Sequence, residues 1–103
     1  MWIEQKVVFT GSIIDLRAIY HADFDFQTLY PCPYLDALGE PIDDRCYAWC
    51  LEHWGTTNSA RIIDIIYDEE NCILTCCFMT ESPPIGLFVY LNKLYPLLAI
   101  TRH

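Results

Sequence analysis

A short helix with a defined beginning and end, in the middle of the chain, constrains the fold more than any other feature. Asp43 and Asp44 follow a proline and are suited to begin this helix, because acidic side chains interact favourably with free amides at a helix N-terminus. Gly55 is suited to end it, because glycine readily adopts the left-handed conformation common at helix C-termini. The sequence therefore predicts a helix over residues 45–54.

The residues of this central helix divide into two faces. Cysteine, leucine and aromatic residues recur at i, i+1, i+4, i+5 and i+8, which lie on one side of a helix. The predicted apolar face consists of Cys46, Tyr47, Cys50, Leu51 and Trp54, and the opposite face of Arg45, Ala48 and Glu52. Trp49 lies off the apolar face, so we expect it to pack against a loop or to contact a partner.

The segment before this helix predicts a strand, a helix and a long loop. Ile3, Val7 and Phe9 alternate with polar residues, which favours a strand with one buried face. Ser12 and Asp15 form a capping-box pattern, in which the serine oxygen accepts from the Asp15 amide. The helix that they begin should end near His21 and bury Ile13, Leu16 and Tyr20. Residues 22–42, rich in Pro, Asp and aromatics, predict an irregular loop with at most a short turn.

The segment after the central helix predicts a hairpin of two strands. Residues 61–67 are strongly β-branched, residues 68–71 suit a turn, and residues 72–80 suit the returning strand. Both strands carry apolar residues on both faces. We therefore expect segment 22–60 to fold across the second face of the sheet, with another molecule as the alternative cover.

The C-terminal part of the chain predicts a last helix and a closing strand. Ser82 is suited to cap the helix, with Pro83 at its first position, and Tyr95-Pro96 to end it. Apolar residues lie on two stripes of this helix, so we expect it to be broadly buried. Residues 97–102 then supply an edge strand.

The order of these elements predicts an α+β fold. It is the ferredoxin-like βαββαβ plan with a loop-plus-helix insertion after the first helix, and residues 1–103 form a single domain.

Composition favours a protein partner. The chain carries 14 acidic and 6 basic side chains, for a net charge of −8, and the basic residues are scattered, so we expect no direct binding to nucleic acid. The hydrophobic fraction of 53% is high for a small domain, so we expect a protein partner or self-association to cover exposed apolar surface.

The sequence shows neither a secretory signal pattern nor an apolar run long enough to cross a bilayer. We therefore expect a soluble protein of the host cytoplasm or of a virion, without membrane contact.

Six cysteines offer the only candidate for metal or thiol chemistry. They are Cys32, Cys46, Cys50, Cys72, Cys76 and Cys77, and we expect them to be free buried thiols. The best metal candidates are Cys46, Cys50 and His53 along one edge of the central helix, which Cys32 or Cys76 could complete. Because no CxxC pair is present, neither a metal nor a cofactor is predicted. The chain also lacks the common catalytic motifs, so we expect no enzymatic activity.

Several motifs together resemble a known family. They are Trp49-Cys50-x-x-His53-Trp54-Gly55-Thr56, then Ser82-Pro83-Pro84-Ile85 and Tyr95-Pro96, with Phe24-x-Phe26 and Tyr30-Pro31-Cys32-Pro33 upstream. The chain is similar to the YubB-like ferredoxin-like domains of phages, plasmids and large DNA viruses. Family members commonly continue Trp-Gly-Thr with Lys and Trp, where this chain has Thr57 and Asn58. The resemblance implies a fold and a genetic setting rather than a reaction.

We therefore expect a small, acidic, non-enzymatic interaction or structural module, either a virion component or a binder of a host factor. The residues expected to contact the partner are Phe24, Phe26, Tyr34 and Trp49. One alternative is an acidic inhibitor or DNA mimic that acts on a host nucleic-acid-binding protein. Another is a protein with a zinc or thiol site at Cys46, Cys50 and His53.

Overall fold

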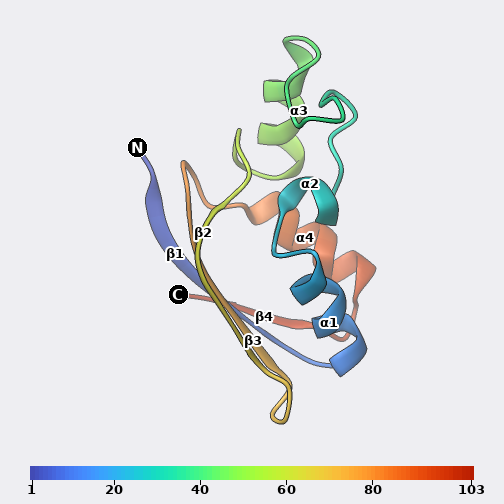
Figure 1. The fold of residues 1–103 in the computed structure, drawn as a ribbon, viewed down its shortest axis with the longest axis vertical. Helices are drawn as coiled ribbons and strands as arrows, with labels where there is room; N and C mark the ends of the chain where they lie inside the picture. Colours follow the sequence, from blue (N-terminus) through green and yellow to red (C-terminus); the bar gives the residue numbers. More distant parts are fainter.

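One four-stranded antiparallel sheet carries all the helices on the same face (Figure 1). The computed structural model describes residues 1–103. The elements in chain order are β1 (Ile3–Thr10), α1 (Ile13–His21), α2 (Phe26–Leu29), α3 (Arg45–His53), β2 (Arg61–Asp68), β3 (Ile73–Thr80), α4 (Ile85–Leu94) and β4 (Ala99–Arg102). The strand order is β2-β3-β1-β4. The predicted fold class, a βαββαβ plan with an insertion after the first helix, is confirmed, and the insertion holds the two helices α2 and α3.

The two central strands, β1 and β3, form the sheet side of the core. Val7 pairs with Cys76 and Phe9 with Leu74, so these side chains share the face that the helices cover. Along β3 every second residue is buried, as the period of a strand requires. The alternation in the sequence therefore predicted the buried face of β1 correctly.

The first helix buries only part of the predicted stripe, together with Ile19 outside it. Leu16 and Ile19 are fully buried, whereas Tyr20 is 38% exposed and lies beside Tyr67, with ring centroids 4.9 Å apart. The cap also differs, since the Ser12 oxygen accepts from the amide of Ile14 rather than that of Asp15, at 3.2 Å.

Ser82 does not cap α4, which begins at Ile85 with no side-chain cap. Its hydroxyl instead donates to the carbonyl oxygen of Gly55 at 2.6 Å and ties the end of α3 to the start of α4. The expectation of a broadly buried α4 is also wrong in part. Leu87, Phe88 and Leu91 are buried, but Ile85, Val89 and Leu94 are about half exposed, because only one side of the helix faces the sheet.

The central helix has the predicted bounds to within one residue, but it buries only part of the predicted face, which includes the buried Trp54. Its chain leaves through Gly55, whose φ of 93° suits glycine. Cys46 and Cys50 are buried, whereas Tyr47 and Leu51 are 55% and 56% exposed. In Figure 1, α3 extends beyond the end of the sheet.

The outer face of the sheet has no cover. Segment 22–60 lies on the same side as α1 and α4, so the expectation that it crosses the second face is wrong (Figure 1). Phe24 is the reason, because it packs against Phe9 and Phe78 with ring centroids 5.9 and 5.0 Å away, which pulls the segment into the helix-side core. None of the helices is long and apolar enough to cross a membrane.

Candidate functional site

Three buried thiols from two separate parts of the chain lie together beneath α3. Cys46 and Cys50 are one helical turn apart, and their sulfur atoms are 4.0 Å from each other. Cys32 comes from the loop after α2, and the three sulfur atoms all lie within 4.8 Å of one another. All three residues are at most 3% exposed. We refer to Cys32, Cys46 and Cys50 as the thiol cluster.

Hydrogen bonds from two sides fix the position of Cys32. The Gln27 side chain accepts from the Cys32 amide at 2.8 Å and donates to the Cys32 carbonyl at 3.1 Å. The backbone amide of Tyr34 points at the Cys32 sulfur, with nitrogen and sulfur 3.4 Å apart.

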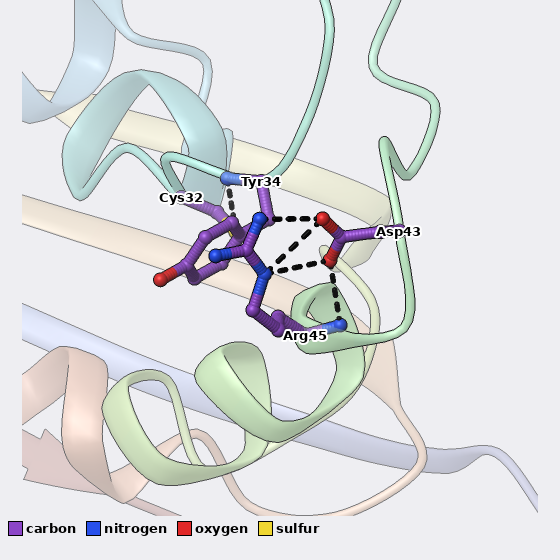
Figure 2. Close-up of polar contacts among 4 residues, drawn as sticks. All are labelled: Cys32, Tyr34, Asp43 and Arg45. Atoms are coloured by element: carbon purple, nitrogen blue, oxygen red, sulfur yellow. Dashed lines mark hydrogen bonds and ion pairs between the residues drawn. The ribbon is translucent and has the colours of Figure 1, made fainter.

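Arg45 joins this loop to the start of α3 (Figure 2). Its guanidinium lies 4.5 Å from the centre of the Tyr34 ring and donates to the carboxylate of Asp43, with the shortest contact at 2.6 Å. The guanidinium beside Asp43 lowers the pKa of that carboxyl below its ordinary value. Because Tyr34 is two residues from Cys32 and Arg45 one residue from Cys46, this contact holds both sides of the thiol cluster together.

A cavity of about 420 Å³ opens beside the two helix thiols, Cys46 and Cys50, which form part of its wall. Asp25 and Glu40 also line it, together with polar residues after α3. Thr57 and Asn58, where the sequence departs from the family pattern, are two of these residues. The Asp25 carboxylate accepts from the Thr28 hydroxyl at 2.7 Å and from the Ser59 hydroxyl at 3.3 Å, which orients it within the wall. The cavity is therefore polar, acidic and bordered by sulfur.

Burial keeps the helix thiols protonated in the absence of a cation. Removal from water raises the pKa of Cys50 and of Cys46 above their ordinary value of 9.0, and the neighbouring thiols raise that of Cys50 further. A nucleophilic cysteine needs the opposite shift. Cys46 and Cys50 are thus unsuited to act as nucleophiles at neutral pH.

His53 does not join the thiol cluster, although the sequence placed it with Cys46 and Cys50. Its Nδ1 atom lies 2.9 Å from the Trp49 carbonyl oxygen, and its ring stacks on the Trp49 ring at 4.2 Å. It faces α4, whose Tyr90 ring stacks on the ring of Tyr30, with the two centroids 3.7 Å apart. Cys32, one of the two residues expected to be able to complete the set, takes the third place, whereas Cys76 lies outside the cluster.

The predicted partner contacts fall into two groups. Phe24 and Phe26 have no exposed surface and belong to the core, so their assignment as partner contacts is corrected. Tyr34 and Trp49 are partly buried, because Tyr34 packs under Arg45 and Trp49 packs between Tyr30 and His53. Trp49 therefore packs against a neighbouring loop, which was the first of the two expectations for it.

Exposed apolar side chains lie on several elements, and those of β2 and the outer face of the sheet form one such surface. No residue of β2 is buried, and Ile62, Ile63 and Ile66 are between 38% and 54% exposed. The strand is at one edge of the sheet and pairs only with β3.

Comparison of the chain with protein-family models, with curated proteins and with solved structures finds no match in any of the three.

Proposed function

We propose that this chain is a small, non-enzymatic interaction module that binds a protein partner by adding a strand of that partner to β2. The observation that carries the proposal is the β2 edge itself, eight residues long and unpaired on its outer side, with five apolar residues beside the charged Arg61, Asp64 and Asp68. In keeping with the family resemblance, the setting we propose is a phage, plasmid or large DNA virus. The partner would then be a virion protein or a host factor.

An apolar edge strand is unusual without a partner. Its free N–H and C=O groups are a template for another strand, and proteins normally protect such edges with charges, proline or a short length. In β2 the register shifts between Ile62 and Asp64, which interrupts regular pairing at the first half of the strand. The second half, from Ile65 to Asp68, pairs regularly with β3, contains no proline and leaves its other edge open. Strand addition at such an edge is an established mode of peptide recognition.

The outer face of the sheet continues the apolar surface next to this edge. Ile66 pairs with Thr75, which in turn pairs with Val8, so the three side chains form a row across the uncovered face. Ile66 is the most exposed of the three at 54%. A partner strand on β2 would place its own side chains beside Ile66 and continue this row.

The site geometry supports a non-enzymatic role. His53 makes its hydrogen bond to the Trp49 carbonyl and none to Cys50, so the pair does not form a nucleophile and its base. The raised pKa of the Cys50 thiol supports the same conclusion.

The test uses matched lysine substitutions in affinity capture from the cells or particles that naturally carry the protein. Ile66→Lys adds a charge to the β2 edge, and Ile14→Lys adds the same charge to an isoleucine of α1 that is 74% exposed. We expect both variants to keep the wild-type unfolding free energy within about 0.5 kcal/mol, since both side chains are at the surface. The protein captured by the wild type should be retained by Ile14→Lys and lost by Ile66→Lys, with little dependence on salt.

Retention of the same protein by Ile66→Lys would overturn the strand-addition proposal. Loss of binding in raised salt for the wild type and both lysine variants would instead favour the acidic inhibitor or DNA mimic, because screening weakens interactions between exposed charges.

A further inference from the structure

We infer that the thiol cluster is a zinc site in which Cys32, Cys46 and Cys50 bind one Zn²⁺ and the neighbouring cavity supplies the fourth position. This site uses none of the residues on which the proposed partner binding depends, so either inference can fail without the other.

The sulfur positions fit the ion. Zn²⁺ takes cysteine sulfur at about 2.3 Å in tetrahedral sites, which places two ligand sulfurs about 3.8 Å apart. The Cys46 and Cys50 sulfurs are 4.0 Å apart, and no pair in the cluster exceeds 4.8 Å. Side-chain movements of less than about 1 Å would therefore bring all three sulfurs to ligand distance.

The surroundings of Cys32 support a ligand role rather than simple packing. A buried thiol that only fills space needs no hydrogen bond to its sulfur. Here the Tyr34 amide is directed at the Cys32 sulfur, and Gln27 bonds to both backbone groups of Cys32. Such outer contacts orient metal ligands.

The cavity offers an entry path and an open coordination position. Cys46 and Cys50 are among the residues that line it, so an ion entering from solvent comes close to two of the three proposed ligand residues. Asp25 and Glu40, on the same wall, attract a cation. A water molecule from the cavity can complete a four-coordinate site, as in zinc centres with three protein ligands.

The binding step balances in atoms and charge. Three neutral thiols and one Zn²⁺ give a zinc tris-thiolate of charge −1, and three protons pass to the buffer. No oxidant or reductant takes part. Protons compete with the ion for all three sulfurs, so binding should weaken steeply as the pH falls.

The first experiment measures zinc binding by the reduced wild-type chain without any substitution. Isothermal titration with Zn²⁺, in two buffers of different ionisation enthalpy and under nitrogen, gives both the stoichiometry and the number of protons released. We expect one Zn²⁺ per chain and about three protons per ion at neutral pH. Substitution with Co²⁺ should give the visible absorption of a tetrahedral site and a sulfur-to-metal charge-transfer band.

The second experiment assigns the ligands with a matched set of alanine variants. Cys32→Ala, Cys46→Ala and Cys50→Ala should each abolish the tetrahedral Co²⁺ spectrum. Cys76→Ala is the control, because Cys76 is equally buried but lies in β3 outside the cluster, and it should keep the wild-type spectrum and affinity.

Three outcomes would overturn the inference. They are the absence of stoichiometric Zn²⁺ binding, release of at most one proton per ion, and equal binding by the cluster variants and the wild type. Binding of Cu⁺ but not Zn²⁺ would also reject the zinc assignment. Should an alanine variant fail to fold, the proton count and the Co²⁺ spectrum of the wild type still decide the question.

Discussion

Gly86 lies so close to the backbone of His53 that no side chain fits between them. A β-carbon at Gly86 would be 2.1 Å from the His53 carbonyl oxygen, well inside van der Waals contact. The next amide along α4, that of Leu87, donates to the Trp54 carbonyl at 3.1 Å. The start of α4 is thereby attached to the end of α3, and α3 carries two of the three thiols.

Gly86→Ala should destabilise the protein. The added methyl would meet backbone atoms of His53 that have no room to move, so we expect a loss of about 1–3 kcal/mol of unfolding free energy, as in other overpacked positions. Urea denaturation would measure this loss of unfolding free energy. Val89→Ala on the same helix is the control, since Val89 is half exposed and should change stability by no more than about 0.5 kcal/mol. Equal midpoints for Gly86→Ala and wild type would contradict this account of the contact between α3 and α4.

The same substitution to valine should change stability differently at two buried threonines. The Thr56 hydroxyl is buried without a hydrogen-bond partner, whereas the Thr80 hydroxyl donates to the Ser82 carbonyl at 2.7 Å and accepts from Gln5. Thr56→Val should therefore leave stability unchanged or raise it by about 1 kcal/mol, while Thr80→Val should lower it by about 1–3 kcal/mol. Thermal or urea unfolding of the two variants side by side provides the measurement. A loss for Thr56→Val as large as that for Thr80→Val would show that the Thr56 hydroxyl has a partner in solution.

The stability of the metal-free, reduced protein should fall at alkaline pH, partly through Cys76. Burial raises the pKa of this thiol from 9.0 to about 12. Because the folded state holds this proton more tightly than the unfolded state, the stabilising contribution of the thiol is complete below pH 9 and is lost as the pH rises towards 12. Within that window the thiol should lower the unfolding free energy by about 1.4 kcal/mol per pH unit.

Urea denaturation at about pH 8 and about pH 10.5 would test this dependence, since both the slope and its sign follow from the shift. Cys76→Ala should lose less stability than the wild type between the two pH values. Cys77→Ala is the control, because Cys77 is the half-exposed neighbour on the other face of β3. Parallel pH curves for the wild type and Cys76→Ala would mean that this thiol ionises equally in both states.

Gln27 should act as a positioning residue for zinc. Gln27→Ala removes both hydrogen bonds that hold the Cys32 backbone, so the affinity for Zn²⁺ should drop about 10–100-fold, the usual effect of losing an outer-shell contact. Competition with a chromophoric chelator measures this affinity, and proton release should stay at the wild-type value because the three thiols remain. Asn92→Ala is the control, because it removes a side-chain amide bonded to a backbone carbonyl, that of Leu98, away from the thiol cluster. Wild-type zinc affinity in Gln27→Ala would refute the positioning role.

Much of the fold could be predicted because it depends on local patterns. Alternation in β1, the β-branched run of β2 and the turn that follows it predicted the strands to within about two residues, the ordinary uncertainty at element ends. Gly55 and the acidic residues before α3 marked the ends of that helix. Capping was less predictable, since Ser82 had an alternative acceptor in the distant carbonyl of Gly55.

The candidate site could be predicted only in part. The spacing of Cys46 and Cys50 on one helix face is a local property, and the structure keeps the two sulfurs together. The positions of Cys32 and His53 were decided by packing. The Tyr30 and Trp49 rings attract the imidazole of His53 to the other side of α3, and Gln27 brings Cys32 to the place that His53 was expected to take.

The sequence by itself determined which segments become strands and helices, because hydrophobic period, β-branching and glycine act within a few residues of each other. The tertiary structure decided which side of each helix is buried, where segment 22–60 lies, and which cysteines meet. These choices depend on contacts between residues far apart in the chain, such as Phe24 with Phe9 and Phe78, and periodicity along one element carries no information about them. The same contacts leave the outer face of the sheet and the β2 edge uncovered, because they hold segment 22–60 in the core on the helix side.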